Sequence, residues 1–177
     1  MKKAITQQNR LTAAGFTLIE LILIMVIIGI AALIAIPTIS SAADVQVRSA
    51  ANRLAADLDY AKGLAITHQR LCAVVFYPNS ESYDIRWTDT DEIVEHPTQP
   101  GRNFVVNFVS EGILKRVNLD STNLDSNTIT FDYLGSPYNG KGTGQPLNSG
   151  RITLKADAFT LYVDVEPVTG YVTINDS

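Results

Sequence analysis

The chain has 177 residues, of which 46% are hydrophobic, and a formal net charge of −4. This acidic balance disfavours binding of nucleic acid through clustered basic residues. The one cysteine, Cys72, excludes an intrachain disulfide. Residues 1–15 hold three bases (Lys2, Lys3 and Arg10) and no acid, so 11 bases remain against 18 acids in residues 16–177, a side-chain charge of −7.

Residues 16–36 form an almost wholly apolar run in which Glu20 is the only ionisable side chain. As a helix, 21 residues extend roughly 31 Å, about the thickness of the hydrocarbon core of a bilayer. The run is longer than the ~7–15 apolar residues of a secretory signal peptide. Because basic flanks stay in the cytoplasm, we expect a single membrane span at about residues 16–36 with the rest of the chain outside. An ordinary signal anchor that happens to contain a glutamate is the alternative.

Glu20 needs compensation in such a segment. A carboxylate at the centre of a bilayer costs about 2.5–3.5 kcal/mol on insertion scales. A cationic partner or protonation would reduce this cost, so the identity of that partner bears directly on function.

Residues 14–21, Ala-Gly-Phe-Thr-Leu-Ile-Glu-Leu, resemble the class III signal of type IV pilin-like proteins. The resemblance implies that prepilin peptidase cuts between Gly15 and Phe16 and N-methylates Phe16, which makes residues 1–15 a leader. It also implies that Glu20 is the acid that such proteins use in assembly. Pro37 matches the proline that commonly follows one membrane span into the mature helix, where it kinks the helix.

Cleavage after Gly15 would free a cationic amine on Phe16, and this explains why an acid can be tolerated at Glu20. In a pilin-like fibre, Glu20 of one subunit would pair with the Phe16 amine of its neighbour and set the axial register, as a lone polar group does in a coiled coil. Three alternatives stay open from the sequence. Glu20 pairs with its own amine, it is protonated, or a partner protein supplies the counter-charge.

A helical pattern resumes after Pro37 and predicts one helix over residues 16–70, kinked near Pro37. Its second half has an apolar stripe with alternating steps of four and three residues, as expected for packing on a sheet. The stripe consists of Val47, Ala51, Leu54, Leu58, Ala61 and Ala65.

Residues 71–177 have the pattern of a β-rich domain. Glycines and prolines mark residues 135–150 as a long loop, residues 88–102 as a polar loop and residues 167–170 as a tight turn. The expected strands cover residues 71–77, 82–87, 103–109, 113–119, 128–134, 151–155, 159–166 and 171–174.

Three segments of this half, residues 131–137, 150–154 and 169–172, are similar to the GspH/FimT group of minor pseudopilins and minor pilins. The resemblance implies an α+β, pilin-like fold, with a long N-terminal helix, transmembrane in its first half, packed on a C-terminal antiparallel β-sheet domain. It implies a minor pseudopilin of a type II secretion system, anchored in the bacterial inner membrane with residues 71–177 in the periplasm. The implied partners are other pseudopilins or pilins, prepilin peptidase, the inner-membrane assembly platform and the lipid of that membrane.

The alternative function is a minor pilin of a type IV pilus, similar to FimT, and some pilins of that kind are implicated in DNA binding. The charge of the C-terminal region argues against nucleic acid as a partner. Residues 141–177 hold three bases against four acids, and residues 169–177 hold no base.

Signs of an enzyme are weak in this sequence. The two histidines, His68 and His96, fall in different predicted elements, and Cys72 lies in an apolar strand where it is expected to be a small buried side chain. Four acids between residues 89 and 95 lack the glycine spacing of a calcium loop, so we interpret them as part of a solvated loop. We expect no catalytic residue, no metal site and no cofactor.

Overall fold

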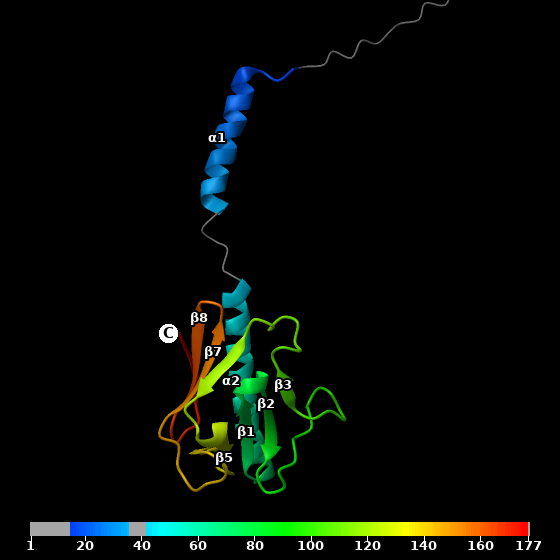
Figure 1. The fold of residues 1–177 in the computed structure, drawn as a ribbon, viewed down its shortest axis with the longest axis vertical. Coiled ribbons are helices and arrows are strands. Elements are labelled where there is room, and N and C mark those ends of the chain that lie inside the picture. The colour runs from blue at the N-terminus through cyan, green and yellow to red at the C-terminus, as the bar shows by residue number, and fades with distance from the viewer. Residues whose placement is uncertain (1–14, 36–41, 177) are drawn as a thin grey trace, which may run out of the picture. The chain divides into compact units, whose positions relative to one another are not determined.

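The computed structural model describes residues 15–35 and 42–176, and of residues 33–35 it describes the backbone alone. The chain divides into two units, residues 1–39 and residues 40–177. In the first unit, helix α1 spans Leu18–Ala35. The second unit holds helix α2 and nine strands (Figure 1). Pro37, the expected kink, lies outside the described residues.

Helix α2 spans Ala42–His68 and is the central element of the second unit. It ends because Gln69 adopts a left-handed conformation, with φ of 53°, and the Arg70 N–H donates to the carbonyl oxygen of Ala65 at 3.2 Å. The predicted apolar stripe is confirmed, since all six of its members are fully buried. Ala43 and Ala50 extend the buried face.

Within residues 42–176, nine strands form two antiparallel sheets. The five-stranded sheet has the order β3-β2-β1-β5-β6, and the four-stranded sheet has the order β4-β7-β8-β9. The strands are β1 (Cys72–Tyr77), β2 (Ser82–Trp87), β3 (Val105–Asn107), β4 (Asn118–Thr122), β5 (Thr128–Phe131), β6 (Pro137–Asn139), β7 (Gly150–Ala156), β8 (Phe159–Val165) and β9 (Val172–Asp176). Short 3-10 helices cover Pro78–Ser80 and Asp125–Asn127.

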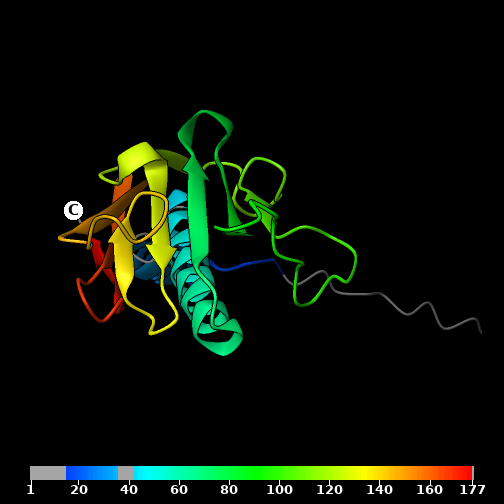
Figure 2. The same cartoon turned by 90° about the horizontal axis from the view of Figure 1, so that it is seen from below.

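The two sheets lie around α2, as the view in Figure 2 shows. The helix contacts β1 and β5 of one sheet and β7, β8 and β9 of the other. One hydrophobic core therefore joins all three layers, and its largest fully buried side chains include Leu54 and Leu58 from α2 and Ile85, Ile129 and Leu154 from the sheets. The expected α+β class, a helix packed on antiparallel sheets, is confirmed.

The expected strand over residues 113–119 is wrong in position. Two successive turns replace its first half, because the Leu114 N–H donates to the Glu111 carbonyl and the Val117 N–H donates to the Leu114 carbonyl. Leu114 and Val117 are both buried through these turns, so their apolar character does not report a strand. The strand itself is β4, which lies further along the chain.

The expected strand at residues 128–134 stops at Phe131, and a short strand, β6, lies inside the expected loop at 135–150. Buried Asp132 causes the early stop. Its Oδ1 atom accepts hydrogen bonds from the backbone N–H groups of Leu134 and Ser136, both at 2.9 Å. The carboxylate thereby holds a tight turn and returns the chain for pairing with β5.

Candidate functional site

The N-terminal candidate site consists of Gly15, Phe16 and Glu20, which stand together at the start of α1. Gly15 has no neighbouring atom within 4 Å of the position that a Cβ would occupy. The side chain of Phe16 is 76% exposed, and the helix begins two residues later at Leu18. The Gly15–Phe16 peptide bond thus lies in an exposed, non-helical segment just before the helix, where a protease can reach it.

Glu20 is the third residue of α1, and its backbone is capped by Thr17. The Glu20 N–H lies 3.1 Å from the Thr17 carbonyl oxygen and 3.3 Å from Thr17 Oγ1. Thr-x-x-Glu is the sequence of a capping box, in which the threonine and the acid each satisfy backbone N–H groups at a helix start. A carboxylate in the first turn also interacts favourably with the helix dipole. The Thr17 hydroxyl thus caps the start of α1 at Glu20, and the expected assembly role of Glu20 stays a prediction.

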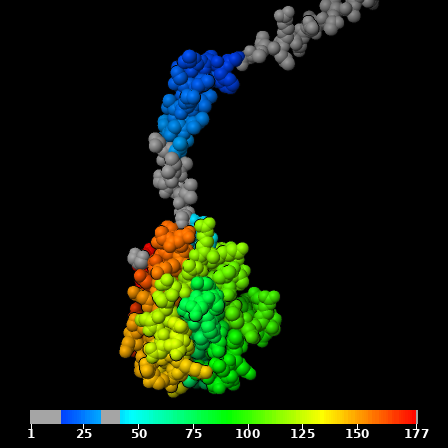
Figure 3. Space-filling view, viewed as in Figure 1, coloured from blue at the N-terminus to red at the C-terminus, as the bar shows by residue number. Residues whose placement is uncertain are grey.

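Large apolar side chains between Phe16 and Ile30 are exposed in this unit, whose helix α1 is blue in Figure 3. Leu18, Met25 and Ile28 are 79%, 67% and 62% exposed. Within residues 15–35 and 42–176, no helix combines the length and the apolar character needed to cross a bilayer.

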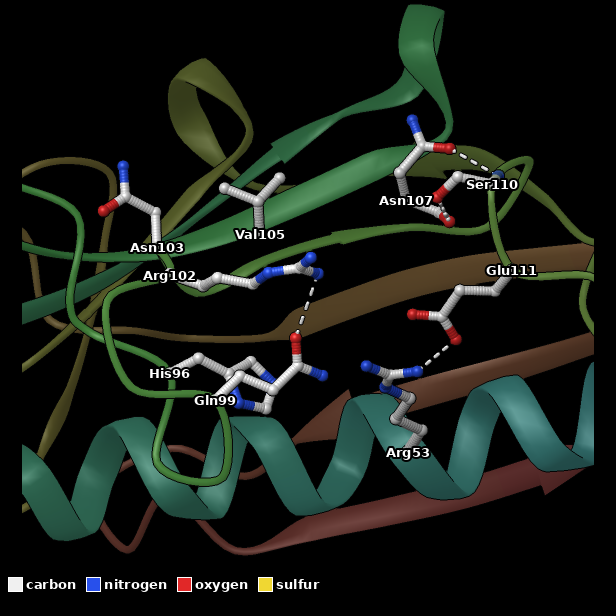
Figure 4. A pocket seen from close by; sticks show the side chains of 9 residues that line it. All are labelled: Arg53, His96, Gln99, Arg102, Asn103, Val105, Asn107, Ser110 and Glu111. Atoms are coloured by element: carbon white, nitrogen blue, oxygen red, sulfur yellow. Dashed lines mark hydrogen bonds and ion pairs between the residues drawn. The ribbon is translucent and has the colours of Figure 1, made fainter.

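A second candidate site is a polar groove of about 510 Å³ in the second unit (Figure 4). Its floor includes Arg53 of α2, and its walls come from the polar loop that follows β2 and from β3 with the turn after it. Among its lining residues, three carry basic side chains and one carries a carboxylate. They are Arg53, His96, Arg102 and Glu111.

Arg53 is held at the groove by acids on both sides. Its Nη1 atom pairs with Glu111, and its Nε atom lies 3.8 Å from Asp57 Oδ2. Asp57 in turn accepts a hydrogen bond of 2.6 Å from the hydroxyl of buried Tyr83. Burial raises the pKa of the Asp57 carboxyl, and the Tyr83 hydrogen bond and the charge of Arg53 oppose that rise. The Arg53 guanidinium is therefore already engaged by this network.

The loop that carries His96 and Arg102 is packed firmly against α2. The ring of His96 stacks on Phe104 with centroids 4.8 Å apart, and Phe104 stacks on Tyr60 of α2 at 5.6 Å. The backbone N–H of His96 donates to the carbonyl oxygen of Arg102 at 2.8 Å. The sequence prediction of a polar loop is correct here, and its pairing across the bridge between Glu95 and Asn103 gives it a defined shape.

Other polar residues singled out in the sequence have structural surroundings. Burial raises the pKa of the Cys72 thiol to about 12. The ring of His68 lies against Trp87, and its Nδ1 atom is 3.2 Å from the Leu64 carbonyl oxygen. In the acidic loop, Asp89 pairs with Arg70 at 2.7 Å. The Cys72 thiol, with its raised pKa, is a poor nucleophile at neutral pH.

Comparison with known protein families supplies the decisive observation. The family model described as "Type II transport protein GspH" matches residues 50–169, which is most of the chain. The chain belongs to the GspH family. A second model, the prokaryotic N-terminal methylation motif, matches residues 10–36 and so includes Gly15, Phe16 and Glu20. No curated protein sequence matches the chain.

A solved structure shows the same fold, and a second one is similar in part. The minor pseudopilin EpsH of the type 2 secretion system of Vibrio cholerae superposes with a TM-score of 0.52 at 9% identity, over 74% of this chain and 97% of that one. The type IV minor pilin FimU of Pseudomonas aeruginosa superposes with a TM-score of 0.48 at 14% identity, over 72% of this chain and 91% of that one. The two family matches together make this GspH family member a type IV pilin-like protein, and its methylation motif indicates a membrane-anchored pilin.

The polar groove was not apparent from the sequence of this GspH family member. Arg53 lies 43 positions before His96 in the chain, and His96 and Arg102 share an irregular loop. No rule of sequence spacing connects such residues. The capping box was visible in the sequence as Thr17-x-x-Glu20, before an apolar run.

Proposed function

We propose that this GspH family member is a minor pseudopilin of a type II secretion system, a structural subunit of the periplasmic pseudopilus and not an enzyme. The observation that carries this proposal is the presence of two signals in one chain. The methylation motif at residues 10–36 precedes a domain that matches a type II transport family at residues 50–169. A pilin-like anchor joined to such a domain is what a pseudopilus subunit requires.

Maturation would begin with prepilin peptidase, which cuts between Gly15 and Phe16 on the cytoplasmic face and methylates the new amine of Phe16. The mature subunit would then cross the inner membrane once, with the apolar segment of residues 16–36 in the lipid and the β-rich domain of residues 71–177 in the periplasm. Residues 16–70 would form the helical spine, kinked at Pro37. The exposed Gly15–Phe16 segment supports the cleavage step.

Assembly would use Glu20 and the exposed apolar surface of α1. Extraction from the membrane leaves this surface without lipid, and helices of neighbouring pseudopilins can cover it. Glu20 would meet the methylated amine of Phe16 on the adjacent subunit and fix the register. The inner-membrane assembly platform would be the partner during extraction.

A deletion strain tests the secretion role against the pilus role. In a host that has both machines, loss of this chain should stop the export of a type II cargo enzyme and leave twitching motility intact. Complementation with the wild-type chain should restore export, and complementation with Gly15→Arg, which blocks cleavage, should not. A motility defect with normal export would instead favour the minor pilin of a type IV pilus.

Intact-mass spectrometry of the membrane-extracted protein tests the processing step. The expected mass is that of residues 16–177 with one added methyl group. An uncut leader, or a chain trimmed beyond the apolar run, would refute the proposed maturation.

A further inference from the structure

Arg102 differs from the other arginines that the structure describes. In the described ranges there are seven arginines, and all except Arg102 form an ion pair with an aspartate or glutamate. The Arg102 side chain makes one hydrogen bond, from Nη1 to Gln99 Oε1 at 3.2 Å. Its guanidinium can therefore still form a paired, planar contact with a carboxylate.

The groove around Arg102 has the charge of an anion site. Glu111 is the one carboxylate among its lining residues, and that group is engaged by Arg53 from the floor of the groove (Figure 4). We propose that the groove binds a glutamate or aspartate side chain on an extended, partly apolar segment of another protein, with Arg102 as the main contact. The amide side chains of Gln99 and Asn103 line the same groove and can bond the backbone of that segment.

The wall that carries Arg102 is ordered before any ligand arrives. Glu95 Oε1 accepts a hydrogen bond from the Gly101 N–H at 2.5 Å, and Gly101 has a φ of 79°, which suits glycine in this turn. The Arg102 N–H donates to the Gln99 carbonyl at 3.1 Å. A preformed wall lowers the ordering cost of binding, so one well-placed charge contact can give measurable affinity.

A peptide fits this site better than an inorganic ion or a nucleic acid. Val105 lines the groove at 49% exposure, and Val109 and Ile113, which flank the lining residues Ser110 and Glu111 in the chain, are 57% and 75% exposed. An inorganic anion gains nothing from such an apolar rim. A nucleic acid needs several phosphate contacts, whereas Arg102 is the one arginine among the groove's lining residues that has no acidic partner.

Binding at the groove needs only the second unit, so it can be tested apart from the secretion role. The full chain in a non-ionic detergent is titrated with the capped peptide Gly-Ser-Val-Glu-Val-Ser-Gly, labelled with rhodamine, at low salt. Fluorescence anisotropy should show saturable binding. The peptide with glutamine in place of the central glutamate should bind at least about fivefold more weakly, because a charge-assisted hydrogen bond is roughly twice as strong as a neutral one.

Two substitutions and a matched control identify the contact. Arg102→Gln should weaken binding about tenfold, and Arg102→Lys should weaken it less, because the charge remains and the paired geometry is lost. Arg116→Gln removes the same charge from another exposed arginine, one that pairs with Asp157, and should change the affinity less than about twofold. The exposed Arg102 side chain makes an unfolded variant unexpected, and circular dichroism checks this.

Four results would overturn the inference. They are the absence of saturable binding, equal affinity for the two peptides, an Arg116→Gln effect as large as that of Arg102→Gln, and displacement of the peptide by inorganic phosphate or duplex DNA at equal concentration. The last result would show a general anion site. Normal secretion with failed peptide binding would reject the groove alone, and failed secretion function with peptide binding intact would reject the secretion role alone.

Discussion

Replacing Glu20 with glutamine separates two roles that this side chain can have, namely capping the start of α1 and pairing with a neighbouring subunit. Glutamine has nearly the same shape and also serves in a capping box, so the start of α1 should be retained. The substitution removes the negative charge that the Phe16 amine of a neighbouring subunit would meet. In the pairing role the substitution leaves that amine without a partner where water is excluded, which is costly. In the capping role it changes little.

The expected magnitudes differ enough to decide between the roles. An N-cap contact such as that between Thr17 Oγ1 and the Glu20 N–H contributes about 1 kcal/mol to helix stability. Breaking a buried ion pair by removing one partner costs about 3–5 kcal/mol. Glu20→Gln should therefore leave membrane insertion and cleavage intact and reduce assembly by roughly a hundredfold or more.

The assay compares the fraction of the chain in cross-linked or sheared fibres with the fraction in the membrane pool, after processing has been verified by intact mass. Thr17→Ala is the matched control, because it removes the capping hydroxyl and keeps the charge of Glu20. It should reduce assembly by no more than about fivefold, the equivalent of the lost cap. Normal assembly of Glu20→Gln, or an equal defect in Thr17→Ala, would contradict the pairing role.

Three further predictions concern the second unit and use denaturant unfolding. Leu58→Ala should cost about 2–5 kcal/mol, because Leu58 is fully buried on α2, whereas Leu134→Ala at a 71% exposed site should cost less than about 0.5 kcal/mol. Gly170→Ala should cost about 2 kcal/mol or more, because Gly170 has a φ of 58° and a Cβ there would lie 3.1 Å from the backbone oxygen of Gly135. Gly142 has a φ of 89° but open space around the Cβ position, so Gly142→Ala should cost about half as much. The hydrogen bond from Arg151 lowers the pKa of Asp164 below its unfolded value near 3.8. The Asp164 carboxylate therefore stabilises the folded state above that pH, and this contribution is lost as the pH falls through the folded pKa. Asp164→Asn should flatten the decline in unfolding free energy on the acid side.

The helical parts of the fold were predictable because their signals are local. In α2, one stripe at helical spacing identified the buried face from Val47 to Ala65 without any knowledge of the sheets. The strands β1 and β2 were located closely for a similar reason, since β-branched and aromatic residues alternate between clear turns. Such patterns depend on neighbours in the chain, which the sequence contains.

The irregular half of the domain was predicted less well because side chains at a distance determine it. The turn at Asp132 exists because one buried carboxylate binds two backbone N–H groups, and a strand pattern of apolar residues does not reveal that contact. Leu114 and Val117 are buried by turns and imitate a strand in the sequence. β6 has only three residues and depends on its pairing with β5.

The candidate sites show the same division. Gly15, Phe16 and Glu20 lie within six residues, so a motif of fixed spacing could predict them. Arg53 and Arg102 approach the same groove only because a loop after β2 folds back over α2 through the stack of His96 on Phe104. That contact depends on tertiary structure, and no local pattern predicts it.

The pairing of the arginines suggests why the groove stands out on an acidic protein. An exposed ion pair contributes only about 0–1 kcal/mol, so the six paired arginines add little to stability. Their pairing does neutralise most basic side chains on the surface of a chain with 18 acids and 14 bases. Against that background Arg102 forms no ion pair with an acid of the described residues, and complementary charge guides encounter as well as register. An acidic segment of a partner would therefore be repelled from most of this surface and attracted to the groove.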